Sequence, residues 1–338
     1  MSIMLGTSFY SFQEDYLIGK RNLEDCVKAA TQDIGSPGVE VLFEETPLPD
    51  MLKNDRTISP GDLYYWNRLM KQYGAVPTSY GCYLPHLAYR DRALTYREHL
   101  KWVQKDIENA AILGFPVART GVFSQNEMRM IEALLPTAEK LGVQIAMEIH
   151  NPRGLHSWYT KDWMEIVKRT ESPAMGVIID LNIFCTGLCD PQIKQLVRMG
   201  GDLEIIEAID AAHKQGKDLT EEEIQKMGGG EIELSALNAV KSCEYDNPED
   251  LKDILPFCKH IHGKFLEINE EGIDRSIDYD NVIRVLCEAG WSGTISSEYE
   301  GQRWYFDEGC DIYMDPVVQV KAHQDMVRRY IAKYSKLN

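Results

Sequence analysis

The sequence has 338 residues, 44% of them apolar, and a formal net charge of -17 at pH 7. This length accommodates a large core, arranged either as one barrel or as two ordinary domains. The negative charge speaks against nucleic-acid binding, because phosphate contacts need clustered Lys and Arg.

Residues 1–12 lack the basic segment that begins a secretory signal, and no apolar run approaches the roughly 20 residues needed to span a bilayer. We therefore expect a soluble, cytoplasmic protein with no membrane partner. The eight cysteines lie mostly within apolar patterns, which favours reduced thiols in the core.

Short apolar runs of the β type alternate along the chain with longer segments of helical periodicity. The predicted strands are 4–9, 39–43, 76–80, 117–120, a run that begins at 144, 175–180, 260–265 and 294–298. The predicted helices are 23–34, 63–73, 96–113, a segment that runs through 141, 163–170, 282–289 and 316–334.

Two of these helices carry clear start and stop signals. Thr95 and Glu98 have the spacing of a capping box, and Gly114 follows as a stop. Ser124 precedes the next helix, which Gly142 ends. The alternation predicts an α/β protein, a (β/α)8 TIM barrel formed by a single domain over residues 1–338.

One unit of the predicted barrel is much longer than the others. The sixth and seventh strands are separated by a segment that indicates a helical insertion over residues 185–256. Within it, 202–216 and 220–227 have helical patterns with many charges. The insertion is either a solvated helical elaboration or a surface that binds a partner or covers the substrate.

Ionisable residues stand where the later strands end. The fifth strand leads into Glu148, Ile149 and His150, and side chains that alternate along a strand place Glu148 and His150 on the same side. Burying two such groups costs several kcal/mol unless they are paired or bind a metal.

The next three strands add further potential metal ligands: Asp180, His262 and Glu298. Each also has an ordinary structural explanation. Asp180 could cap the following turn, His262 could be a core histidine whose hydrogen bonds are satisfied, and Glu298 could pair with a Lys. The tips of consecutive barrel strands meet, so we expect Glu148, Asp180, His262 and Glu298 to form one metal site. Three carboxylates and one imidazole suit Mn²⁺ or Mg²⁺, with Co²⁺, Fe²⁺ or Zn²⁺ as substitutes.

This quartet, with the run 260–264 around His262, resembles the metal site of the xylose isomerase-like barrel superfamily, which includes sugar epimerases, inosose dehydratases and endonuclease IV. The endonuclease IV-like members need a further His three residues beyond the sixth-strand Asp. The chain has Ile183 at that position.

Three features together resemble most closely the catalytic α subunit of bacterial C-glycoside deglycosidases: His150, the long insertion and the stretch 296–303. The resemblance implies a hetero-oligomer with a small β subunit. It also implies a glycoside substrate, a 3-oxo-C-glycoside of a plant phenolic such as a flavonoid, in which the enzyme breaks the carbon–carbon bond between sugar and aromatic ring.

The residues fit this chemistry. A ketone at C3 acidifies the proton on C2, a bound metal stabilises the enediolate, and His150 would be the catalytic base. The plain alternative for His150 is support of Glu148. We expect Tyr83, His86 and Lys264 to bind substrate; the alternatives are loop packing for Tyr83 and His86, and a carboxylate partner for Lys264.

Two other functions remain open at this point. A metal-dependent sugar or cyclitol isomerase or epimerase would use the same enediolate but return the proton to carbon. A barrel without catalytic activity would bind a sugar or a partner subunit through its acidic insertion.

Overall fold

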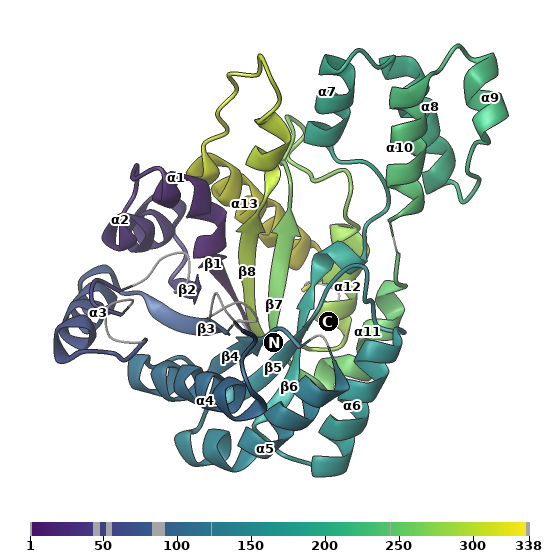
Figure 1. Cartoon of the computed structure of the whole chain (residues 1–338). Coiled ribbons are helices and arrows are strands. Elements are labelled where there is room, and N and C mark those ends of the chain that lie inside the picture. Colours follow the sequence, from purple (N-terminus) through teal and green to yellow (C-terminus); the bar gives the residue numbers. More distant parts are fainter. Residues whose placement is uncertain are drawn as a thin grey trace.

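The computed structural model describes residues 2–42, 48–51, 56–82, 92–122, 124–243 and 245–335. Within these ranges eight parallel strands close into a barrel in which each strand pairs with its neighbour in sequence and the last pairs with the first (Figure 1). The strands are β1 (Ile3–Ser8), β2 (Gly38–Leu42), β3 (Val76–Cys82), β4 (Val117–Thr120), β5 (Gln144–Ile149), β6 (Met175–Asp180), β7 (Cys258–Phe265) and β8 (Gly293–Tyr299). The predicted (β/α)8 barrel is confirmed.

Helices cover the outside of the barrel (Figure 1). Those that follow β1 to β5 are α1 (Gln13–Leu17), α2 (Leu23–Lys28), α3 (Pro60–Tyr73), α4 (Tyr96–Leu113), α5 (Gln125–Leu141) and α6 (Trp158–Thr170). After β6 come α7 (Asp190–Arg198), α8 (Leu203–Lys214), α9 (Glu221–Lys226), α10 (Glu231–Lys241) and α11 (Leu251–Ile254), then α12 (Tyr279–Glu288) and α13 (Pro316–Tyr334). In the described part of the chain, no helix is both long and apolar enough to cross a membrane.

The predicted capping residues of α4 are confirmed, but several helices begin a few residues before the start that their apolar periodicity predicts. Thr95 and Glu98 form the capping box of α4. Helix α3 starts at Pro60 because Ser59 and Asp62 form an unpredicted capping box. Helix α6 starts at Trp158 because the side chain of Ser157 accepts a hydrogen bond from Thr160 N. Capping residues are polar and precede the apolar stripe, so the stripe alone places the start too late.

The four helices α7 to α10 project from the barrel beyond the ends of β7 and β8 (Figure 1). They have an apolar core of their own, separate from the main core, built around residues such as Leu188, Ile206 and Leu237. Helices α8 and α9 occupy the two segments predicted to be helical. The boundaries 185–256 for an insertion within a single domain 1–338 stay a prediction.

A half-buried arginine joins these helices to the barrel. Arg275, in the loop after β7, donates hydrogen bonds to both carboxylate oxygens of Glu207 at 2.8 and 2.9 Å and to Asp210 at 2.8 Å. Asp210 also accepts from Leu188 N and from Lys214. The orientation of α8 is therefore fixed by paired charges as well as by packing.

All eight cysteines are free thiols. Five are buried, whereas Cys185, Cys243 and Cys310 are partly exposed. The Sγ atoms of Cys185 and Cys243, which flank α7 to α10 in the sequence, lie 3.1 Å apart. Cys185 thus has Cys243 as its close thiol neighbour, a contact that no sequence pattern predicts.

A neutral histidine links α13 to the barrel wall. Nδ1 of His323 lies 2.9 Å from Ser297 Oγ, and Nε2 lies 2.7 Å from Tyr279 Oη. The hydroxyl of Tyr279 donates to the Lys264 carbonyl, so Nε2 carries the hydrogen and Nδ1 accepts from Ser297. Burial lowers the pKa of His323 to about 3.

This lowered pKa predicts acid sensitivity. An unfolded His titrates near 6.5. Between about pH 6.5 and 3 the unfolded state therefore binds a proton that the folded state excludes. As the pH is lowered through this range, the free energy of unfolding falls by up to about 1.4 kcal/mol for each pH unit. In metal-free protein, His323→Gln should be less stable at pH 7 but lose stability less steeply below pH 6.5. Urea unfolding from pH 4 to 7.5 measures the slopes, with exposed His156→Gln as the control; equal slopes in wild type and His323→Gln would refute this role.

Candidate active site

A cavity of about 340 Å³ opens where the strands end. Its volume is in the range of small-ligand sites, and active sites of such barrels lie at this end. The residues that line it are Tyr10, Arg119, Gly121, Glu148, His150, Tyr159, Asp180, Asn182, Lys264, Glu298 and Glu300.

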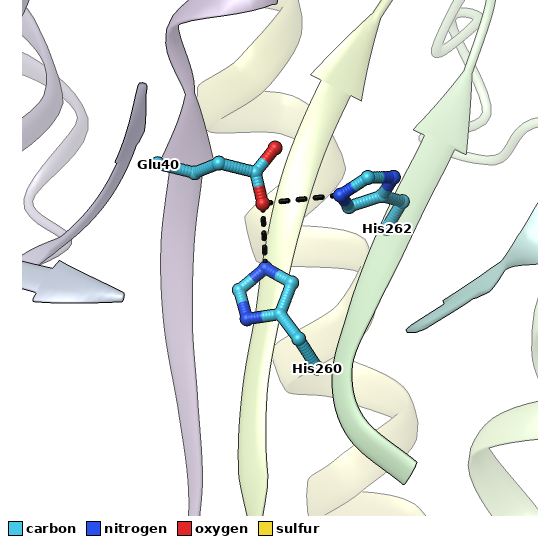
Figure 2. Close-up of side chains that lie close together, drawn as sticks. All are labelled: Glu40, His260 and His262. Atoms are coloured by element: carbon cyan, nitrogen blue, oxygen red, sulfur yellow. Dashed lines mark hydrogen bonds and ion pairs between the residues drawn. The ribbon is translucent and has the colours of Figure 1, made fainter. Parts of the chain in front are cut away.

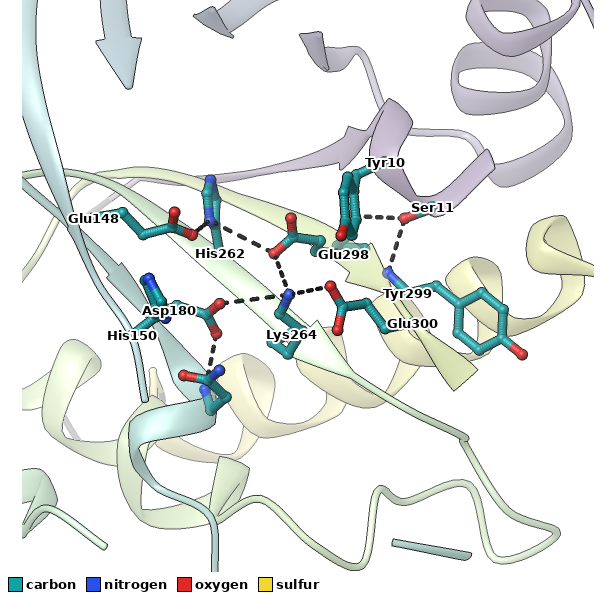
Figure 3. A network of polar contacts seen from close by, with 12 residues as sticks. Tyr10, Ser11, Glu148, His150, Asp180, His262, Lys264, Glu298, Tyr299 and Glu300 are labelled. Carbon is teal, nitrogen blue, oxygen red and sulfur yellow. Dashed lines mark hydrogen bonds and ion pairs between the residues drawn. The ribbon is translucent and has the colours of Figure 1, made fainter. Parts of the chain in front are cut away.

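The four predicted ligand side chains converge at this end of the barrel. Glu148, Asp180, His262 and Glu298 each offer one ligand atom, and these atoms all lie within 4.8 Å of one another (Figure 3). All four side chains are buried. The register of the barrel produces this convergence, because Asp180 of β6 lies beside His262 of β7 in the sheet.

The electrostatics of the quartet suit a cation. Burial raises the pKa of Asp180 to about 7; Lys264 acts against this rise, and the charges of Glu298 and Glu148 add to it. Oε2 of Glu298 is buried and makes no hydrogen bond within the described residues, although Lys264 Nζ lies 3.0 Å away as an ion pair. Three buried carboxylates with one imidazole therefore form a donor set that can hold a divalent metal ion.

His262 faces this set through its Nδ1 atom. Nδ1 lies 2.6 Å from Glu148 Oε1 and 3.6 Å from Glu298 Oε2. Burial would lower the pKa of His262, but the neighbouring carboxylates of Glu40, Glu298 and Glu148 raise it well above its usual value. Nδ1 is thus the nitrogen positioned to bind an ion among the carboxylates.

Arg119 belongs to the site, although the sequence analysis did not single it out. It projects from β4, and its Nη1 donates to Glu148 Oε2. Burial raises the pKa of Glu148, but Arg119 and His262 outweigh it and hold that pKa well below the usual range. A charged residue within the short apolar run 117–120 was the available signal.

Lys264 occupies the centre of a second group of charges. Its Nζ lies 2.8 Å from Glu300 Oε1, 3.0 Å from Glu298 Oε2 and 3.6 Å from Asp180 Oδ2 (Figure 3). These carboxylates raise the pKa of Lys264 well above its usual value, against the effect of burial. The predicted pairing with a carboxylate is therefore present, and Lys264 also lines the cavity, as a substrate-binding residue must.

His150 comes directly after β5 and lines the same cavity as Glu148. Its Nδ1 lies 2.6 Å from the carbonyl oxygen of Asn151. A carbonyl oxygen accepts but does not donate, so Nδ1 carries the hydrogen and Nε2 keeps its lone pair. Asn151 is held in turn by Asn182, whose carbonyl accepts from Asn151 Nδ2 at 2.6 Å.

Asp180 also caps the turn after β6, as its structural alternative predicted. Its Oδ1 accepts a hydrogen bond from Asn182 N at 2.9 Å, which caps the turn after β6. The other oxygen, Oδ2, faces Lys264. Tyr83 and His86, the remaining predicted substrate-binding residues, lie outside the described residues.

The fold and the arrangement of the four converging side chains are typical of one class of protein. A family model described as xylose isomerase-like TIM barrel matches residues 29–330, and the chain belongs to this family. The predicted resemblance to this superfamily is confirmed.

Relatives with related names extend over nearly the full chain. A 3'-dehydrocarminate deglycosidase alpha subunit from Microbacterium sp. is 28% identical, and the match covers 96% of this chain and 94% of that protein. A C-glycoside deglycosidase alpha subunit from Arthrobacter globiformis is 27% identical, with 96% of this chain and 89% of that protein covered. The predicted resemblance to the α subunits of C-glycoside deglycosidases is confirmed by this similarity.

Solved structures share the fold at low sequence identity. D-psicose 3-epimerase from Clostridium cellulolyticum H10 matches with a TM-score of 0.61 and 11% identity, over 97% of this chain and 99% of that one. A 3-keto-D-glucoside 4-epimerase from E. coli matches with a TM-score of 0.54 and 13% identity, over 97% and 100%. These likenesses show the barrel fold.

Proposed function

We propose that this chain is the catalytic subunit of a metal-dependent C-glycoside deglycosidase, a carbon–carbon lyase that acts on 3-oxo-C-glycosides. The observation that carries the proposal is the convergence of four buried side chains that can bind a metal, three of which line the same cavity as His150. The names of the full-length relatives support the choice of reaction.

The metal ligands would be Glu148, Asp180, His262 and Glu298. Their hard, mostly oxygen donor set favours Mn²⁺, with Mg²⁺, Co²⁺, Fe²⁺ or Zn²⁺ as alternatives. When bound, the ion would act as a Lewis acid on the ketone oxygen at C3 of the sugar, an effect worth several kcal/mol.

His150 would remove the proton from C2. Its Nε2 lone pair is available because Nδ1 is committed to the Asn151 carbonyl. A base positioned in this way typically contributes about 10²- to 10⁴-fold. The electron pair left by the C2 proton forms the C1=C2 double bond, and the bond from C1 to the aromatic carbon breaks. The departing aromatic carbon takes up a proton. The products are the aglycone and an unsaturated 3-oxo sugar, and together they contain all the atoms of the substrate.

Lys264 would bind a sugar oxygen at the edge of this site. Losing a charged hydrogen bond costs about 1.5–3 kcal/mol. We therefore expect Lys264→Met to lower kcat/KM for the glycoside by about 10- to 100-fold, mainly through KM, without lowering metal content. The matched control is Lys194→Met, which removes a lysine that pairs with Glu267 rather than with the quartet. An unchanged kcat/KM would show that Lys264 pairs with the carboxylates but does not bind substrate.

A small β subunit is the proposed partner, and a hetero-oligomer the proposed assembly. The support is that the relatives are named as alpha subunits. Tyr83 and His86 stay predictions as substrate-binding residues.

The alternative function is a metal-dependent sugar or cyclitol isomerase or epimerase. The same quartet and the same base at one cavity favour it, because proton removal beside a ketone is the first step of both reactions. The two differ only in whether the carbon skeleton of the substrate survives.

The direct test is release of aglycone from a 3-oxo-C-glucoside. Purified protein, stripped with a chelator and reloaded with Mn²⁺, is assayed alone and with the β subunit encoded by the same source. We expect aglycone only in the reloaded sample. Isomerised glycoside without aglycone would favour the alternative function.

A further inference from the structure

A second cluster of ionisable side chains lies beside the quartet, inside the barrel. It consists of Glu40 on β2 together with His260 and His262 on β7 (Figure 2). Glu40 has no exposed surface, and His260 is 1% exposed. Neither residue is among those that line the cavity.

One oxygen of Glu40 faces both imidazoles. Oε2 lies 2.8 Å from His260 Nε2 and 3.1 Å from His262 Nε2 (Figure 2). Because a carboxylate oxygen accepts, it favours a hydrogen on Nε2 of His262 and leaves Nδ1 to face the quartet. The two nitrogens of His262 are thus divided between Glu40 and the proposed metal site.

We propose that Glu40 is a positioning residue that orients His262 for metal binding, with His260 holding the Glu40 carboxylate in place. Carboxylates commonly bind the remote nitrogen of a metal-bound histidine, fixing its tautomer and ring orientation. The inference rests on the metal site of the proposed function and holds for either of the two reactions considered above.

The barrel geometry brings these side chains together. Side chains two apart on β7 point to the same side, so His260 and His262 both face the interior. Their ring centroids lie 5.7 Å apart with an interplanar angle of 81°, which leaves Glu40 Oε2 within reach of both Nε2 atoms. The other oxygen, Oε1, is buried without a hydrogen bond among the described residues.

The test is metal affinity in Glu40→Gln. This variant keeps the shape of the side chain but removes its charge. We expect wild type to bind one Mn²⁺ per chain and the variant to bind it about 10- to 100-fold more weakly, as measured by calorimetry and by the electron paramagnetic resonance signal of free Mn²⁺. The visible absorption of the Co²⁺-loaded form should also change, because the ligand geometry changes.

Three controls separate positioning from a merely structural role. Glu267→Gln alters another buried, ion-paired glutamate, one that contacts Lys194 and Tyr305 rather than His262. It should leave affinity and spectrum as in wild type. Thermal unfolding of metal-free protein shows whether Glu40→Gln remains folded; His260→Gln, which keeps Glu40 and His262, should weaken binding less than Glu40→Gln.

Three results would overturn the inference. An affinity of Glu40→Gln within twofold of wild type, with the same Co²⁺ spectrum, removes the positioning role alone. Two ions per wild-type chain, one of which Glu40→Gln loses, would make the cluster a metal site in its own right. Wild type that binds no divalent ion would overturn the metal site itself, and the proposed function with it.

Discussion

Replacing Glu298 by Gln, or His262 by Ala, is expected to abolish both metal retention and turnover. Each change removes a ligand from a set whose four atoms lie within 4.8 Å of one another. If the ion supplies several kcal/mol of stabilisation, its loss lowers the rate by about 10³-fold or more. Elemental analysis of the purified variants and an aglycone-release assay measure the two effects.

The control for this experiment is another buried glutamate. Glu233 on α10 is 6% exposed, and its carboxylate accepts from Asp202 N and Gly230 N within the helices that project from the barrel (Figure 1). Glu233→Gln should keep its metal and its activity. Full metal content in Glu298→Gln and His262→Ala would show that these residues are not ligands.

His150→Ala is expected to lose about 10²- to 10⁴-fold in kcat while retaining its metal. The reason is that His150 offers a free Nε2 at the cavity but is not among the converging ligands. The assay should be run with and without added imidazole, which fits the space left by the deleted ring and should restore part of the rate.

The alternative role of His150 is to support Glu148, and it predicts a different result for the same variant. In that case His150→Ala would lose metal affinity, and excess Mn²⁺ rather than imidazole would restore the rate. Deuterium on C2 of the substrate adds an independent readout, because a slower reaction of the labelled substrate is expected only where C2 proton removal limits the rate.

Much of the fold follows from local sequence signals. Most of the strands contain apolar runs that suit burial on both faces, and caps such as Thr95 and Gly114 mark helix ends within a few residues. The strand ends were informative because an ionisable residue such as Asp180, directly after a buried run, has few structural uses. Closure of the barrel then brings the strand tips together without further information.

What the sequence did not reveal depends on contacts between distant strands. Glu40 and Arg119 each interrupt an apolar strand, which is a signal, but their partners on β7 and β5 follow only from barrel closure and register. The same holds for Glu300, whose pairing with Lys264 requires β7 and β8 to be adjacent. The proposed ligands therefore follow from the sequence, whereas the charges that contact Glu148 and His262 do not.

The proposed reaction links proton removal from C2 to cleavage of the bond between sugar and aglycone. Both events can be followed in a reaction of the Mn²⁺-loaded protein and its β subunit with a 3-oxo-C-glucoside in D₂O, with mass spectrometry and NMR of all products. We expect free aglycone with one deuterium on the carbon that carried the sugar, together with an unsaturated 3-oxo sugar. Recovery of intact glycoside with deuterium on the sugar ring and no aglycone would rule out the lyase reaction and establish an isomerase or epimerase instead.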